Sequence, residues 1–436
     1  MSPLSIIICI LGIGIIATVH ELGHFFVARL FKIRVYELSI FVGPKLFSWK
    51  KNDVEYYIRL IPFGAYVRFS DLSEEGEEIA SDDPHQLINQ PRWKRLLVSL
   101  AGPFMNIILG IIIFLSCFSI YGFYSVNQDI IVEDTQVAET CIEEGDTILS
   151  LNGEPIFTQI DFSYLYDKIP NKDPMTLEMR SARTGEKYEV TLTPTITNQY
   201  MLGITRYADL DENGGWLVSE VDASQNNGNP LLQPDDSILS INGVSVSDPN
   251  VSSVITGSGG AVLTVHLIRD GQEMDVSLAP QMVESSNYRG VFLKEGSGFL
   301  NKIRESFLFP ISLFRVSIDS LSEAFSGSVK PYDVVSGPVG IASVVSDVVD
   351  EEDTQVEEKT EMLLILAGAI SVGVAFTNLL PLPGLDGNAI VLTVVEMVRG
   401  KPISKRTEQI INIVGLVLIV GLVLFALFSD IIRLTQ

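Results

Sequence analysis

Two histidines and a glutamate near the start of the chain have the spacing of a metalloprotease site. They form the run His20-Glu21-Leu22-Gly23-His24. On a helix, residues four apart differ by about 40° in azimuth, so both imidazoles point the same way and can bind one Zn²⁺. In this pattern Glu21 is not a ligand. It lies beside the metal and acts as a general base toward water.

The surroundings of this run strengthen the prediction. HExxH arises by chance in many sequences, but here it lies in a stretch that is otherwise apolar from Leu4 to Val19. Charged side chains within a membrane span cost about 2.5–3.5 kcal/mol each on insertion scales. They therefore indicate a function. The alternative is a pair of satisfied core histidines near a helix end, which leaves Glu21 unexplained.

A site of this kind needs a third protein ligand and an open position for water. Acidic residues in apolar surroundings are few, and the candidates are Asp386 and Glu396. Asp386 lies in the segment 378–387, which holds two prolines and two glycines and so predicts a broken helix lining a site. The alternative is that Asp386 N-caps a helix over 387–398. Glu396 is interpreted as an interfacial residue near Arg399.

Asn378 is the other polar residue of this broken apolar segment. A buried amide needs hydrogen-bond partners. Asn378 could therefore bind the substrate backbone or steady a developing oxyanion. The alternative is a structural hydrogen bond at the helix break.

Charge and cysteine content argue against several other classes of protein. The chain has 436 residues, 19% of them charged, and a net charge of −24. This balance argues against a nucleic-acid partner, which requires clustered Lys and Arg. Cys9, Cys117 and Cys141 are scattered, with no CxxC pair. Neither a disulfide framework nor a cysteine zinc site is indicated.

Four apolar segments are close to or above the roughly 20 residues that cross a bilayer, and these are 4–31, 96–124, 362–382 and 408–428. The shorter apolar stretch 385–398 is interpreted as a buried or re-entrant continuation of the third span. Lys and Arg gather in the loops after the first span and before the fourth, which assigns both loops to the cytoplasm. The region 125–360 then lies outside the cytoplasm.

The loops carry β-rich and amphipathic patterns. Two β-rich runs, 45–50 and 56–61, predict a hairpin in the first cytoplasmic loop. In the outer region, the string at 145–153 recurs 90 residues later at 235–243, and each copy predicts a small β-rich domain. Phe299 to Phe325, interrupted by Pro310, predicts an amphipathic helix pair at the membrane surface. The alternative for that stretch is a buried soluble helix.

Several motifs together resemble a known family. The repeated Gly-Asp-x-Ile-Leu-x-Ile-Asn-Gly string looks like a PDZ domain, although the second copy has Asp235 in place of the usual Gly. The order and spacing of the motifs resemble the site-2 protease family of intramembrane zinc metalloproteases, and most closely its bacterial regulator-of-sigma-E group, over essentially the whole chain. The motifs are HExxH, Asn-x-x-Pro-x-Pro-x-Leu-Asp-Gly from Asn378, Ala101–Asn106, Ile61–Val67 and Ser336–Gly340.

The resemblance implies a role for each site residue. His20, His24 and Asp386 are expected to bind Zn²⁺, Glu21 to be the catalytic base and Asn378 to contact substrate.

The resemblance also implies that the hairpin near 45–69 pairs with an unwound substrate strand. A transmembrane helix must unwind before its peptide bonds can be attacked, and an edge strand can satisfy the freed backbone groups. The chain departs from the family at Asn388-Ala389, where Gly-His is usual, and at Ala65, where a second Gly is usual. The first departure puts in doubt any contact made by that histidine.

The expected fold is a multi-pass α-helical membrane protein with four transmembrane helices, a membrane-associated β-hairpin and two extracytoplasmic PDZ-like domains. The expected segments are a first transmembrane helix with HExxH (1–32), the hairpin loop (33–95), a second transmembrane helix (96–124), two PDZ-like domains (125–200 and 201–285), an amphipathic helical region (297–345), a third transmembrane helix with the broken segment (362–398) and a fourth (408–430).

The expected function is cleavage of a single-pass membrane protein in or near its transmembrane segment, after a first extracytoplasmic cut. The family implies anti-sigma factors or remnant signal peptides as substrates, an inner-membrane location and an active site toward the cytoplasmic side. The alternatives are a non-catalytic PDZ scaffold with a vestigial metal site, and a HExxH membrane protease whose catalytic domain is soluble. A vestigial site should have lost a ligand or Glu21, and all are present.

Overall fold

The computed structural model describes residues 2–72, 78–79, 83–131, 142–143, 145–170, 173–208, 214–222, 230–287, 292–327, 329, 337–351 and 354–435. Cys141, Ser336 and most of the acidic run 74–83 lie outside these residues.

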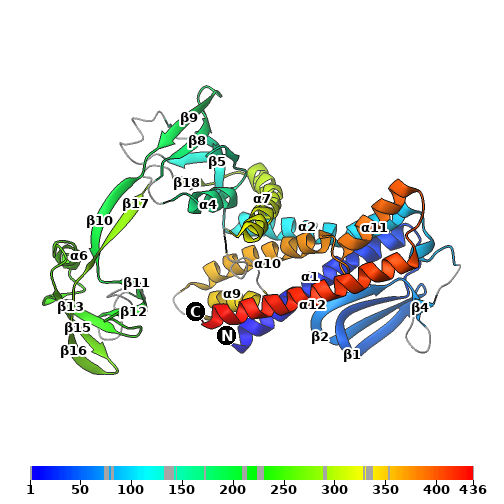
Figure 1. Ribbon diagram of the computed structural model, residues 1–436, viewed down its shortest axis with the longest axis horizontal. Helices are drawn as coiled ribbons and strands as arrows, with labels where there is room; N and C mark the ends of the chain where they lie inside the picture. The colour runs from blue at the N-terminus through cyan, green and yellow to red at the C-terminus, as the bar shows by residue number, and fades with distance from the viewer. Residues whose placement is uncertain are drawn as a thin grey trace.

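Long apolar helices form one bundle (Figure 1). Four of them have the length and composition to cross a membrane, namely Pro3–Leu30, Arg92–Ile120, Val356–Leu379 and the Gln409–Asp430 part of the last helix. The helices of the bundle are α1 (Pro3–Leu30), α2 (Arg92–Ile120), α10 (Val356–Leu379), α11 (Asp386–Arg399) and α12 (Lys405–Thr435). The stretch expected to continue the third span is a separate helix, α11, because the chain turns at 380–385.

A long β-hairpin packs against the α1 helix. It lies at one end of the bundle, and the two smaller β-domains formed by residues 124–295 lie toward the other end (Figure 1). Its strands are β1 (Glu37–Lys51) and β2 (Val54–Arg68), longer than the runs predicted from the sequence. The start of β1, Glu37–Ile40, pairs with both halves of β2, namely 55–58 and 65–68. The second half of β2 is therefore an edge strand of this sheet. Among the described residues it pairs with β1 on one side and with no strand on the other. Two short strands, β3 (Asp71–Leu72) and β4 (Glu78–Ile79), and a 3₁₀ turn (Leu87–Asn89) follow.

The repeated string forms the same structure in both β-domains. In the first copy Asn152 has a positive φ, its backbone N–H donates to the Thr176 carbonyl (2.7 Å), and its Oδ1 accepts from the Thr176 N–H (2.8 Å). In the second copy Asn242 makes the same pair of bonds with Thr264, both at 2.8 Å. The departure at Asp235 is tolerated because this residue has φ +69°, a value that Asp adopts more readily than most residues. The two domains are thus structural repeats.

The second β-domain is inserted into the first. The chain leaves the first domain through β10 (Thr195–Met201) and returns through β17 (Gln281–Asn287), which pairs antiparallel with β10. It then forms β18, which pairs with β5 at the start of the first domain. The first domain therefore extends beyond the 125–200 range. Its elements are β5 (Tyr124–Ile131), β6 (Thr147–Leu151), β7 (Glu154–Pro155), α4 (Gln159–Asp167), β8 (Met175–Arg180), β9 (Lys187–Leu192) and β18 (Phe292–Glu295).

The second domain lies farther from the bundle than the first (Figure 1). Its buried core includes Ile238 and Ile241 and the alternate residues Leu263, Val265 and Leu267. The connecting ribbon and the domain comprise β10 (Thr195–Met201), β11 (Ile204–Ala208), β12 (Trp216–Val221), β13 (Ser237–Ile241), β14 (Val244–Ser245), α6 (Val251–Thr256), β15 (Leu263–Arg269), β16 (Gln272–Leu278) and β17 (Gln281–Asn287).

The α7 helix (Phe299–Ser326) runs unbroken through Pro310, where the sequence predicted a pair of helices. Proline costs an interior helix its N–H bond, but aromatic packing holds this helix onto α2. The ring centroids of Phe309 and Phe114 are 4.6 Å apart, and Phe309 also contacts Phe118. A further helix, α9 (Pro338–Asp350), packs against α1 and α12.

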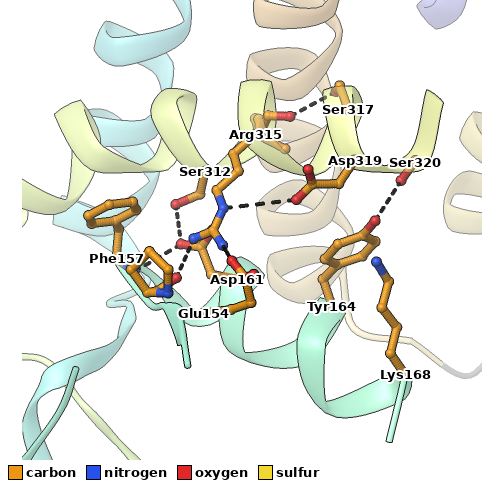
Figure 2. Close-up of polar contacts among 12 residues, drawn as sticks. Glu154, Phe157, Asp161, Tyr164, Lys168, Ser312, Arg315, Ser317, Asp319 and Ser320 are labelled. Atoms are coloured by element: carbon orange, nitrogen blue, oxygen red, sulfur yellow. Dashed lines mark hydrogen bonds and ion pairs between the residues drawn. The ribbon is translucent and has the colours of Figure 1, made fainter. Parts of the chain in front are cut away.

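The first β-domain meets the bundle through polar contacts between α4 and α7 (Figure 2). Ser312 of α7 donates to the buried Asp161 of α4 (2.5 Å). Arg315 donates to Glu154 (2.7 Å) and to the carbonyl of Pro155. These contacts fix the first β-domain against α7.

Candidate functional site

The two histidines of HExxH lie on one face of α1, as their spacing requires. Both are buried, each with 7% of its surface exposed. Their Nε2 atoms are 3.2 Å apart. The Nδ1 atom of His24 is 2.7 Å from the backbone carbonyl of Val98 on α2. A ligating histidine is commonly held in this way through its second nitrogen.

Asp386 joins the histidines from the other end of the chain. Its Oδ2 lies 2.9 Å from Nε2 of His20 and 3.3 Å from Nε2 of His24. The predicted alternative, a side-chain N-cap, is absent here, because Leu385 occupies the N-cap position of α11 and Asp386 is the first helical residue. The structure thus brings together the three residues that the sequence proposed as ligands.

The broken segment before α11 is what places Asp386. The chain leaves α10 and turns through two backbone hydrogen bonds, Leu382 to Leu380 (2.7 Å) and Leu385 to Leu382 (3.1 Å). Gly384 has φ +94°, which favours glycine. At Gly387, a Cβ atom would lie 2.2 Å from the Leu380 carbonyl oxygen. Both glycines are therefore required for this turn.

Gly102 of α2 keeps the space beside the histidines open. A methyl group there would lie 2.3 Å from Nε2 of His24 and 2.6 Å from Nε2 of His20. A side chain would thus fill the position where the ligand atoms converge. Two imidazole nitrogens and a carboxylate oxygen are a donor set that Zn²⁺ takes in catalytic sites, so the residues present fit that metal. The motif Ala101–Asn106 does not by itself indicate this role for Gly102.

Glu21 lies beside the histidines without bridging them. With His20 and His24 it forms a group whose possible ligand atoms lie within 4.8 Å of one another. Its Oε2 accepts the backbone N–H of Val67 (3.0 Å), from the outer half of β2. This contact could not be predicted from the sequence, since backbone groups carry no sequence signal.

The outer strand of the hairpin is held by a buried ion cluster. Arg59 and Arg68 contact the two carboxylate oxygens of Glu37, at 2.9 and 3.3 Å, and the Tyr66 hydroxyl donates to Glu37 (2.5 Å). Burial alone would raise the pKa of Glu37, but the hydrogen bonds from Tyr66 and Arg59 and the charge of Arg68 hold this pKa below its usual value. The carboxylate stays ionised and fixes the strand that reaches Glu21.

Asn378 does not join the histidines. It lies in the last turn of α10, and its Nδ2 donates to the Val374 carbonyl one turn earlier (3.0 Å). This is a structural hydrogen bond next to the helix break, the alternative considered above. A contact with substrate stays a prediction.

The interfacial position expected of Glu396 stays a prediction, but its ionic partners are on another helix. Glu396 is buried, and its Oε2 lies 3.1 Å from Arg95 and 3.6 Å from Arg92, both on α2. Its Oε1 accepts the backbone N–H of Ile403 (3.0 Å). The sequence shows the neighbours of Glu396 along its own helix, but its partners come from about 300 residues away and required the fold.

The chain is similar over nearly its whole length to proteins of one known family. The model of peptidase family M50 matches residues 8–422. The zinc metalloprotease RasP of Oceanobacillus iheyensis is 26% identical, and the match covers 99% of both chains. The regulator of sigma-W protease RasP of Bacillus subtilis is 25% identical over 99% of both chains. The regulator of sigma E protease of Salmonella typhi is 27% identical over 98% of both chains.

The family match extends from the first spanning helix to the last and includes the HExxH run and Asp386. It confirms the resemblance drawn from the motifs. The chain therefore belongs to peptidase family M50, the site-2 protease family of zinc metalloproteases.

Proposed function

We propose that this protein is an intramembrane zinc endopeptidase that cuts single-pass membrane proteins in or near their transmembrane segment. One observation carries the proposal. Asp386 Oδ2 lies within 3.3 Å of Nε2 of both His20 and His24, inside a bundle of helices apolar enough to cross a membrane. A vestigial metal site on a scaffold protein would not be expected to keep this arrangement.

The proposed chemistry divides among a few residues. His20, His24 and Asp386 would hold Zn²⁺, which when bound would supply Lewis-acid chemistry toward the substrate carbonyl and water. Glu21 is the general base. The N–H of Val67 fixes Oε2 of Glu21, so Oε1 is available to accept a proton from water. Asn378 is the proposed contact to the substrate backbone.

The outer half of β2 is the proposed site for the unwound substrate. Alternate residues of a strand direct their backbone groups to opposite edges. The Arg68 carbonyl accepts from Tyr36 on the β1 side, whereas the Val67 N–H faces Glu21. An extended substrate peptide that pairs with β2 along the Val67 edge would form backbone hydrogen bonds there. Its peptide bonds would then lie next to Glu21, the proposed base.

A cavity lies along this outer strand. It has a volume of about 460 Å³ and is lined by Tyr66–Ser70, by Arg95 and Ser99 of α2, and by Ala389 and Thr393 of α11, among others. Ala389 is the position where family members often have histidine. Its small side chain leaves that part of the cavity open.

The relatives suggest the substrate class. Two of these relatives are named as the regulator of sigma-W protease and the regulator of sigma E protease. We propose an anti-sigma factor or a remnant signal peptide as the substrate, cut after a first extracytoplasmic cleavage. The two β-domains are proposed to be PDZ-like, to lie outside the cytoplasm of an inner membrane and to act as a size filter or docking site, with the active site toward the cytoplasmic side.

The first test concerns the base. In membranes that contain a tagged single-pass reporter, Glu21→Gln should abolish cleavage, because the amide cannot accept the proton, while zinc per purified chain stays at the wild-type level. Product mass gives the cut site for the wild type. Glu178→Gln, an exposed change in the first β-domain, is the matched control and should cut normally. Turnover by Glu21→Gln would refute the assigned base.

The second test concerns the third ligand. Asp386→Asn keeps the shape of the side chain and removes its negative charge, so it should lower the zinc content of the purified chain. The measurement is metal analysis after dialysis against a weak chelator. An unchanged zinc content would move the third ligand to another residue.

A further inference from the structure

Asn106 of α2 contacts His20 at Nδ1, the ring nitrogen that does not face Asp386. Its side chain is fully buried, and Nδ2 lies 3.3 Å from Nδ1 of His20. Its Oδ1 has no hydrogen-bond partner among the described residues. The backbone carbonyl of Asn106 accepts the Ser371 hydroxyl (2.8 Å), which ties this turn of α2 to α10. The backbone that carries the amide is thus fixed to α10, and one polar atom of the side chain is unsatisfied.

The two histidines need the same protonation pattern to act as ligands. A neutral imidazole carries its proton on one nitrogen, and the other nitrogen has the lone pair. For His24 the Val98 carbonyl beside Nδ1 can only accept, so the proton lies on Nδ1 and Nε2 is free to bind. Nε2 of His20 faces the same point as Nε2 of His24, so His20 also needs its proton on Nδ1.

The amide of Asn106 can serve either form of His20. With Nδ2 toward the ring, it donates to an unprotonated Nδ1, and the ring proton is then on Nε2, facing Asp386. A 180° turn about χ2 exchanges two atoms of nearly equal size. Oδ1 would then accept the Nδ1 proton, and Nε2 would present its lone pair to the metal.

We propose that Asn106 is a positioning residue that holds His20 in its ligating tautomer by accepting the Nδ1 proton through Oδ1. This inference rests on the proposed zinc site. The partners behind ligating histidines typically change metal affinity by about 10- to 100-fold when they are removed. Asn106 would therefore act on zinc affinity through His20, without touching substrate.

Zinc affinity, measured by competition with a chromogenic chelator on the purified full chain in detergent, tests the proposal. Asn106→Leu has similar volume and no acceptor, and zinc affinity should fall by about 10- to 100-fold. Asn106→Asp keeps an acceptor and should bind zinc at least as tightly as the wild type. Ser371→Ala removes the neighbouring hydrogen bond and leaves the His20 contact intact. It should bind zinc normally.

A second measurement uses the wild-type chain and avoids any question of folding. The chain has only four histidines, so ¹⁵N-histidine NMR of the zinc-loaded protein resolves few rings. The ring nitrogens of His20 should report a protonated, hydrogen-bonded Nδ1, and that proton signal should weaken or shift in Asn106→Leu. A His20 ring protonated on Nε2 would overturn the proposal.

The other outcomes are equally decisive. Wild-type zinc affinity in Asn106→Leu, or an equal loss in Asn106→Leu and Asn106→Asp, would overturn the acceptor role of Asn106. Equal losses in Asn106→Leu and Ser371→Ala would assign the effect to packing and overturn it too. In these cases the wild type still binds zinc and the proposed function stands. Failure of the wild type to bind zinc would instead overturn the ligand set of His20, His24 and Asp386.

Discussion

At the scale of single residues, the site depends as much on a missing side chain as on the ligands. The histidines approach α2 so closely that only glycine fits at position 102. The neighbouring residues on α2 then supply the groups behind the rings, a carbonyl from Val98 and an amide from Asn106. A stretch of about two turns of α2, from Val98 to Asn106, therefore shapes the space, and α1 and α11 fill it with donor atoms.

Gly102→Ala should abolish zinc binding. The added methyl group would lie 2.3 and 2.6 Å from the two Nε2 atoms, where the metal belongs. We expect metal analysis to give close to one zinc per wild-type chain and little in the variant. Gly12→Ala on α1 is the control, because a methyl group there meets nothing within 4 Å, and its zinc content should not change. Full zinc occupancy in Gly102→Ala would contradict this description of the site.

At the scale of elements, α11 is held at both ends. Its first residue is Asp386, at the histidines, and near its last turn Glu396 is paired with the start of α2. The same carboxylate accepts the N–H of Ile403 in the loop toward α12. Since α2 also carries Gly102, this contact fixes α11 to the helix that shapes the site.

Glu396→Ala should destabilise the protein by about 1.5–3 kcal/mol, the usual cost of losing hydrogen bonds to a charged group. It removes the partner of Arg92 and Arg95 and leaves both charges at the start of α2. Thermal unfolding of the purified chain in detergent measures the loss, and zinc affinity should fall with it. Glu178→Ala breaks an exposed pair with Lys187 and should change stability by less than about 1 kcal/mol. Equal effects of the two changes would argue against a role for Glu396 in holding α11.

At the scale of the whole molecule, the β-domains connect to the bundle through α7. The contact in Figure 2 joins α4 of the first domain to α7, and α7 packs on α2 and α10. Asp161 of this contact is buried, and so is Glu305 on α7. The pKa of Glu305 is raised to about 7, mainly by burial; the charge of Arg304 opposes this rise and the charge of Asp161 adds to it.

Stability should therefore fall as the pH rises from about 4.5 to about 7 through Glu305. The folded protein holds this proton more tightly than the unfolded chain, where the pKa is 4.5. The stabilisation is complete below pH 4.5 and is lost once the pH exceeds the folded pKa of about 7. The difference corresponds to about 3 kcal/mol.

Denaturant unfolding at pH 5, 6, 7 and 8 measures this dependence. Glu305→Gln mimics the protonated carboxyl and should remove this part of the pH dependence. Glu323→Gln, on the same helix in a partly exposed pair with Lys168, should retain it. The same pH dependence in wild type and Glu305→Gln would show that Glu305 does not titrate in this range.

The sequence by itself determined the local features. The spacing of His20 and His24 fixes both rings on one helix face, and the Pro-Gly run before Asp386 fixes a helix break, because both depend only on residues a few positions apart. The repeated string predicted two equivalent β-domains for the same reason. Pro310 was misread as a break because packing against Phe114 is not visible in a local pattern.

Only the tertiary structure decided which distant groups meet. His20 and Asp386 are 366 residues apart in the chain, and their contact depends on how α1, α2 and α11 pack. That same packing decides four further features of the site. These are the Val67 N–H at Glu21, the need for glycine at 102, the amide of Asn106 behind His20 and the partners of Glu396. The positions of backbone groups and of unfilled space cannot be predicted from local residue types. The chemistry of the site was therefore readable from residue types, and its shape was not.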